Sequence, residues 1–118
     1  MAKRTVLQII PELETGGAER TAVDIAAALA ARGDRAIVLS EGGGLVAELE
    51  AAGGEHVAFP ARTKNPLALI ANAFRLASMI RRERVDLIHA RSRAPAWSAL
   101  WAARMTGIPF VTTYHGLY

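Results

Sequence analysis

Residues 5–40 read TVLQIIPELETGGAERTAVDIAAALAARGDRAIVLS, and this stretch decides the fold. Residues 5–10 are a near-continuous apolar run, which is typical of a strand that a parallel sheet buries on both faces. Apolar residues then recur at helical spacing over 18–32, and Gly33 follows in the position that commonly ends a helix. A second apolar run covers 36–40. A strand, a helix and a strand in this order predict one unit of a parallel α/β sheet.

The alternation of short apolar runs and longer helical segments continues along the rest of the chain. Three more strands are predicted, over 56–59, 86–89 and 109–113. Three more helices are predicted, over 46–52, 65–84 and 95–106. Five strands that alternate with four helices predict an α/β fold. We expect a doubly wound, Rossmann-like parallel sheet with strand order 3-2-1-4-5, truncated after the fifth strand.

The two longest helices after the first carry large apolar residues whose environment can be predicted. In the helix over 65–84, one set recurs at helical spacing and is expected to face inward: Ile70, Phe74, Ala77 and Ile80. Asn65 is the expected N-cap of this helix. In the helix over 95–106, Trp97 and Trp101 lie one turn apart. We expect them in the core or in an interface, or on an apolar face that a truncated domain leaves uncovered.

Composition and charge exclude several classes of protein. The chain has 118 residues and no cysteine, which excludes disulfides and a zinc–thiolate site. Its net charge of +3 permits an anionic ligand or a membrane surface without demanding nucleic acid. No common nucleic-acid-binding pattern occurs, so no nucleic-acid partner is expected.

No targeting or membrane-spanning segment is expected. The basic start at 1–4 precedes an apolar run that Gln8 interrupts and Pro11 ends, unlike a signal peptide. Charged residues such as Asp24 and Arg75 interrupt the long helical stretches, so no transmembrane helix is predicted. We expect a cytoplasmic protein, with peripheral membrane contact as an alternative.

Ligands of doubly wound sheets bind outside the carboxyl ends of the strands, near the point where the strand order reverses. Three loops are expected to meet there, over 11–17, 90–94 and 114–118. In the first, Gly16 and Gly17 open a helix, where backbone N–H groups can bind an anion. An ordinary strand-to-helix turn is the alternative. The loop is neither the dinucleotide fingerprint nor the phosphate loop of nucleotide-binding proteins.

The other two loops carry candidate binding side chains. Arg91 and Arg93 precede a helix, and the arginine side chain is well suited to binding phosphate or carboxylate. The alternative is a solvated loop in which these arginines form surface salt bridges. His89 ends a strand and is expected to be a core histidine. His115, directly after the fifth strand, can present its imidazole to a ligand, although a lone histidine there is also commonly structural.

Together the loops carry three motifs: LETGGAER at 13–20, DLIHARSR at 86–93 and TTYHG at 112–116. In this order and at these strand ends, the set resembles glycosyltransferase family 4, which has the glycosyltransferase B fold. The resemblance implies two Rossmann-like domains facing a cleft, the N-terminal one holding the acceptor and the C-terminal one a nucleotide-sugar. It further implies transfer with retention of configuration, without a metal or other cofactor.

Residue by residue, the resemblance implies roles for five positions. Gly16 and Gly17 would lie beside the donor phosphate and the acceptor. His115 would contact the donor sugar and stabilise the positive charge that develops at the reacting carbon. Arg91 and Ser92 would line the acceptor side.

One difference from the family concerns length, because the sequence contains neither the later part of the N-terminal domain nor the E-x7-E motif of the second. We therefore expect residues 1–118 to be the incomplete N-terminal domain of a retaining glycosyltransferase, inactive alone, with a homodimer or larger assembly forming through its exposed edges. A stand-alone, non-enzymatic carbohydrate- or anion-binding module is the alternative. A different Rossmann-like enzyme is a third reading, which the missing dinucleotide fingerprint disfavours.

Overall fold

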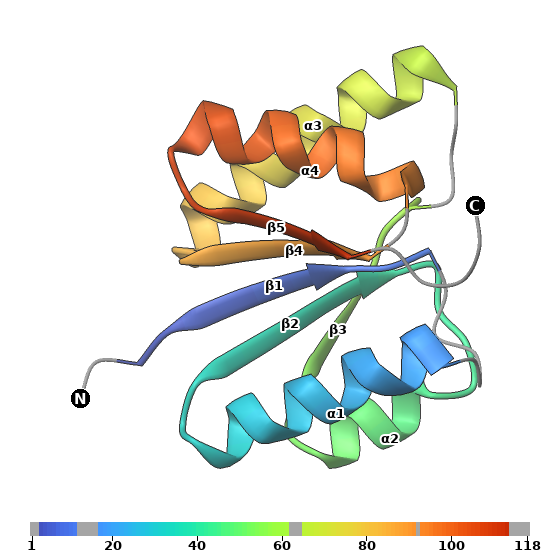
Figure 1. Cartoon of the computed structure of the whole chain (residues 1–118), viewed down its shortest axis with the longest axis vertical. Helices are drawn as coiled ribbons and strands as arrows, with labels where there is room; N and C mark the ends of the chain where they lie inside the picture. Colours follow the sequence, from blue (N-terminus) through green and yellow to red (C-terminus); the bar gives the residue numbers. More distant parts are fainter. Residues whose placement is uncertain (1–2, 12–16, 62–64, 92, 114–118) are drawn as a thin grey trace.

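The computed structural model describes residues 3–11, 17–61, 65–91 and 93–113, and shows three layers (Figure 1). A five-stranded sheet forms the middle layer, and every strand pairs with its neighbours in parallel. The strand order is β3-β2-β1-β4-β5, which confirms the predicted topology. Helices α1 and α2 cover one face of the sheet, and α3 and α4 cover the other (Figure 1).

The strands and helices lie close to their predicted positions. The strands are β1 (Thr5–Ile9), β2 (Arg35–Ser40), β3 (Glu55–Ala58), β4 (Leu87–Arg91) and β5 (Phe110–Thr113). The helices are α1 (Gly17–Ala31), α2 (Val46–Ala51), α3 (Pro66–Glu83) and α4 (Arg93–Thr106). The main differences are that β4 continues two residues beyond the predicted 86–89, to Arg91, and that α4 begins two residues before the predicted 95–106, at Arg93.

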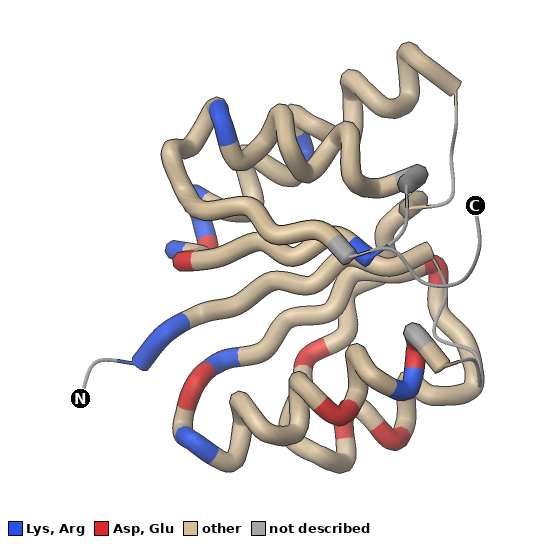
Figure 2. Tube along the Cα trace, viewed as in Figure 1, with Lys and Arg blue, Asp and Glu red and all other residues tan. Residues whose placement is uncertain are grey.

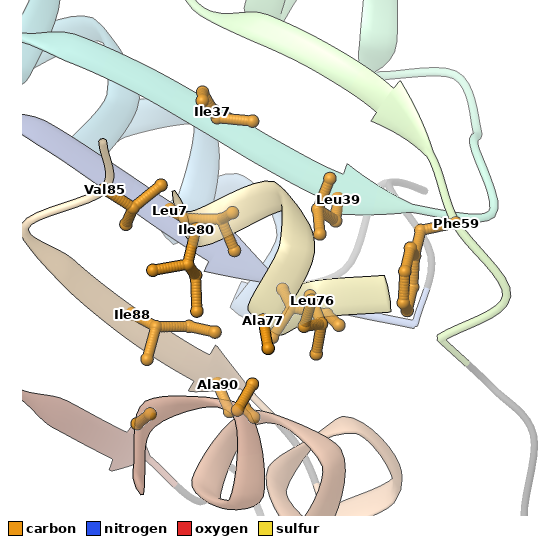
Figure 3. Close-up of a cluster of buried hydrophobic side chains, with 14 of the residues drawn as sticks. Leu7, Ile37, Leu39, Phe59, Leu76, Ala77, Ile80, Val85, Ile88 and Ala90 are labelled. Carbon is orange, nitrogen blue, oxygen red and sulfur yellow. The ribbon is translucent and has the colours of Figure 1, made fainter. Parts of the chain in front are cut away.

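Two apolar clusters hold the layers together, one on each face of the sheet. The larger lies beneath α3 and α4 and includes Leu7, Ile9, Ile37, Leu39, Leu76, Ile80 and Ile88 (Figure 3). The smaller lies beneath α1 and α2 and includes Ile10, Ala22, Val23, Ala26 and Val38. Because side chains alternate along a strand, β1 sends Leu7 and Ile9 into the first cluster and turns Gln8 to the opposite face.

Helix α3 begins as predicted but buries a different stripe. The Asn65 side chain accepts hydrogen bonds from the N–H groups of Leu67 and Ala68, at 2.9 and 3.3 Å, which confirms the N-cap. The buried residues are Asn72, Ala73, Leu76, Ala77 and Ile80. The inward prediction is therefore correct for Ala77 and Ile80.

The same prediction is wrong for Ile70 and Phe74, which are 56% and 62% exposed. Both residues satisfy a helical repeat with Ala77, but the helix is rotated so that Leu76, Ala77 and Ile80 face the core cluster instead. The close backbone neighbour of α3 is α4.

The tryptophans of α4 are not in the core. Trp97 and Trp101 are 63% and 56% exposed, as expected for an uncovered apolar face rather than for core residues. The buried side of α4 consists of small residues: Ser98, Ala99, Ala102 and Ala103. These allow α4 to pack closely on β4, which leaves no room for an indole ring between them.

A charged cluster joins the elements at the amino edge of the sheet, opposite the predicted ligand edge. Arg35, which begins β2, donates to Glu55 of β3 at 2.6 and 2.9 Å. It also forms an ion pair of 2.8 Å with Glu83 at the end of α3. Asp86 accepts the N–H of Thr5 at 2.8 Å, so polar contacts connect the strand starts with one another and with the end of α3.

Candidate functional site

The carboxyl ends of β1, β4 and β5 lie side by side, at the point where the strand order reverses. In register, Gln8 of β1 pairs with His89 of β4, and Arg91 of β4 pairs with Thr113 of β5. The N-terminus of α1 follows β1 at the same edge (Figure 1). The strand ends that precede the three predicted loops therefore lie at one edge, as the topology rule for doubly wound sheets requires, while the loop over 114–118 itself lies outside the described residues.

Arg91 is the most unusual residue at this edge. It ends β4 and only 2% of its surface is exposed. Its Nε atom donates a 2.8 Å hydrogen bond to Oε1 of Gln8, and Nε2 of Gln8 donates to the Ala22 carbonyl in α1 at 3.1 Å. This chain of hydrogen bonds ties β4 to β1 and β1 to α1. It also holds the guanidinium in one orientation on the α1 side of the sheet.

One donor of Arg91 is not used within the described structure. Its Nη2 atom is buried and has no hydrogen-bond partner. Burial lowers the pKa of the Arg91 guanidinium because the protein interior disfavours its charged form. An arginine side chain nevertheless stays protonated in proteins. The edge therefore contains a fixed, buried positive charge with an unsatisfied donor, which is the arrangement that an anion would satisfy.

The sequence-based alternative for Arg91, a solvated loop with surface salt bridges, is wrong. The physical reason is the extra length of β4, because its pairing with β5 continues to Arg91. Sequence reasoning missed Gln8 as a site residue. Its signal was present, since a long polar side chain inside a buried apolar strand needs an internal partner.

Gly17 lies at the first position of α1, whose N-terminus points toward this edge. A Cβ atom added there would meet nothing within 4 Å, so neighbouring described atoms do not require glycine. The absence of a side chain at Gly17 leaves open space beside the N–H groups at the start of α1. Gly16, Ser92 and His115 lie outside the described residues, so their predicted roles stay predictions.

A second polar pair lies at the carboxyl end of β2, away from Arg91. The Ser40 hydroxyl is 2.7 Å from Nε2 of His56, and it accepts the N–H of Gly42 at 3.0 Å. The pair has the composition of a nucleophile and a base, but Ser40 is fully buried. We interpret it as the anchor of the glycine-rich loop that follows β2.

Other kinds of site find no support in the part of the chain that the structure describes. It contains no group of three or more His, Asp or Glu side chains that could hold a metal ion. No described helix is both long and apolar enough to cross a membrane.

Comparison with known proteins identifies the family. A sequence profile for Glycosyltransferase Family 4 matches residues 15–118. The chain belongs to glycosyltransferase family 4. It is also similar to a glycosyltransferase from Rickettsia africae, with 41% identity and a TM-score of 0.89 over 100% of this chain. This chain spans 31% of that enzyme's length. No curated protein sequence matches the chain significantly.

More distant structures share the fold of this family 4 chain. MurG from Acinetobacter baumannii is 18% identical, with a TM-score of 0.73 over 98% of this chain and 37% of its own. The C-terminal domain of a Pyrococcus furiosus hydrogenase is 21% identical, with a TM-score of 0.68 over 95% of this chain and 92% of its own. At these identities the likeness shows the fold alone. The family assignment confirms the resemblance that the three motifs carry.

Proposed function

We propose that this family 4 chain is the acceptor-side part of a retaining glycosyltransferase that takes its sugar from a nucleotide-sugar. The observation that carries the proposal is Arg91, a buried cation with a free Nη2 donor at the ligand edge of the sheet. Family membership supports sugar transfer in general. In the proposal a second domain holds the nucleotide, so residues 1–118 alone are catalytically incompetent.

In this proposal Arg91 binds an anionic group of the substrate. The guanidinium offers charge-assisted hydrogen bonds, and Gln8 prevents it from turning away. The N-terminus of α1 adds its partial positive charge at the same edge, and Gly17 leaves space for the ligand. A phosphate or carboxylate on the acceptor has the chemistry that these groups recognise.

The remaining site residues have roles that the family resemblance supports. Gly16 and Gly17 lie beside the donor phosphate and the acceptor, and Ser92 lines the acceptor side. His115 contacts the donor sugar and stabilises the charge that develops at the reacting carbon. No metal takes part in this mechanism.

The test uses the complete protein that carries this sequence and screens a panel of nucleotide-sugars for transfer. With the active pair, Arg91→Met raises the Michaelis constant for the acceptor by about ten- to a hundredfold, because a charge-assisted hydrogen bond contributes about 1.5–3 kcal/mol. Arg91→Lys keeps the charge and recovers part of the loss. Arg32→Met, at an exposed position after α1, is the matched control.

Two results would contradict the proposal. If no nucleotide-sugar supports transfer by the complete protein, the proposed reaction is wrong. If transfer occurs and Arg91→Met leaves the Michaelis constant for the acceptor unchanged, the reaction stands and the role of Arg91 is wrong.

A further inference from the structure

The outer surface of α3 and α4 contains an apolar groove with a volume of about 660 Å³. Its main lining residues are Leu69, Ile70, Phe74, Trp97, Trp101 and Met105. The one hydroxyl group among its described lining residues, that of Ser98, donates to the Leu69 carbonyl at 2.8 Å. The described side chains that line the groove are therefore aromatic or aliphatic, or have their polar group already hydrogen-bonded within the protein. Apolar surface of this extent marks an interaction site.

Charge is distributed unequally between the two faces of the molecule. The α3/α4 side has two carboxylates, Glu83 and Asp86, and its exposed arginines are more numerous: Arg75, Arg81, Arg82, Arg84 and Arg104. The α1/α2 side, residues 17–61, contains seven carboxylates against three arginines. Figure 2 shows the acidic residues gathered along α1, α2 and the adjoining strands. The groove thus lies on the basic face of a molecule whose opposite face is acidic.

Two exposed arginines lie next to residues that line the groove. Trp101 follows Trp97 by four residues and Arg104 follows Trp101 by three, so the three side chains share one exposed stripe of α4. Arg81 of α3 donates to the carbonyl of Met105 at 3.1 Å, which places a second guanidinium at the end of the groove. Aromatic surface with arginines beside it is the composition of a surface that enters a membrane interface.

We propose that this groove and its arginines bind the surface of an anionic lipid bilayer. Trp97 and Trp101 would lie at headgroup depth, where indole rings are favoured, and Arg104 would reach the lipid phosphates. The acidic α1/α2 face is repelled by the same surface, so the charge asymmetry orients the molecule. A symmetric dimer through this face would instead bring the exposed arginines of both copies together, which disfavours a second copy as the occupant.

The test is flotation of the complete protein with vesicles of phosphatidylcholine, with and without about a third of phosphatidylglycerol. The protein is expected to float with the anionic vesicles and to dissociate when the salt is raised to about 1 M, where the Debye length falls to about 3 Å. Arg104→Glu should weaken binding by at least about fivefold, the effect of one arginine near such a surface. Arg32→Glu makes the same charge change on the acidic side and should bind like the wild type.

A second measurement reports whether the groove itself meets the lipid. Brominated lipids should quench tryptophan fluorescence, and Trp97→Phe with Trp101→Phe should abolish that quenching while binding persists. Trp101→Gln should weaken binding by about tenfold, because it removes apolar area at an exposed position where folding loses little.

Equal binding by the wild type and Arg104→Glu would overturn the proposal, as would absence of quenching from Trp97 and Trp101. If the protein forms a dimer and Trp101→Gln dissociates it, the groove binds a second copy instead of a membrane. If iodide does not quench the fluorescence of these tryptophans in the complete protein without lipid, another part of the same polypeptide covers the groove. None of these measurements requires a donor sugar, so their outcome is independent of the proposed transfer activity.

Discussion

Replacing Gln8 with leucine removes both hydrogen bonds that tie β1 to β4 and α1 at the ligand edge of the sheet. Leucine has a similar volume and suits a buried strand, so little cavity forms. The cost is electrostatic, because Arg91 keeps its charge and its burial but loses the acceptor for Nε. The Ala22 carbonyl loses its donor as well.

The magnitude follows from these two contacts. A hydrogen bond to a charged group contributes about 1.5–3 kcal/mol, and a neutral one contributes about 1 kcal/mol. Gln8→Leu should therefore lower the free energy of unfolding by about 3 kcal/mol. Arg91→Met leaves only the Gln8 oxygen without its donor and removes a buried charge. It should therefore lower the free energy of unfolding by only about 1 kcal/mol.

The double variant Gln8→Leu with Arg91→Met is the decisive control. It replaces both partners by apolar side chains, which is close to neutral when the shapes match. Its stability should therefore exceed that of Gln8→Leu alone, with a coupling energy of about 2–3 kcal/mol. Urea unfolding followed by circular dichroism at pH 7 gives the free energies.

The reasoning would be refuted by either of two results. One is a Gln8→Leu variant that loses less than about 1 kcal/mol, which would mean that Arg91 does not depend on Gln8. The other is a double variant that loses the sum of the single losses, which would mean that the two residues act independently.

Two further predictions concern the core and the amino edge. Leu76→Ala, at a fully buried position of α3, should lower the free energy of unfolding by about 3 kcal/mol, whereas Leu67→Ala, at an exposed position of the same helix, should change it by less than about 0.5 kcal/mol. Equal losses in urea unfolding would contradict the packing of α3. At the amino edge, hydrogen bonds from Arg35 hold the pKa of the Glu55 and Glu83 carboxyls below the ordinary 4.5. The folded pKa is the lower one, so this contribution to stability is present above pH 4.5 and is lost as the pH falls through the folded values. Between about pH 6 and pH 3, the melting temperature of Arg35→Met should therefore fall less than that of the wild type. Equal decreases in melting temperature would contradict this.

Much of the architecture could be predicted because its signals are local. The periodicity of apolar residues separates strands from helices, and Asn65 begins α3 through contacts within its own first turn. The order of the elements then leaves few topologies, since parallel strands need crossover connections. The edge at which ligands bind follows from that topology.

Side-chain environments could be predicted less well, because they depend on neighbours far away in the sequence. Ile70 and Phe74 satisfy helical spacing as well as the buried stripe does, and only the rotation of α3 against the sheet separates the two. Trp97 and Trp101 are exposed because the small residues of α4, rather than its largest ones, meet β4.

The sequence by itself determined the order of the elements, the parallel sheet and the edge that carries the motifs, because each depends on local periodicity or on chain topology. The tertiary structure alone decided that Arg91 is buried. Its partner Gln8 is 83 residues away, and the two meet only because β1 and β4 pair in one register. A shift of one residue in that pairing would turn every side chain of β4 to the other face, so no local pattern could have shown it.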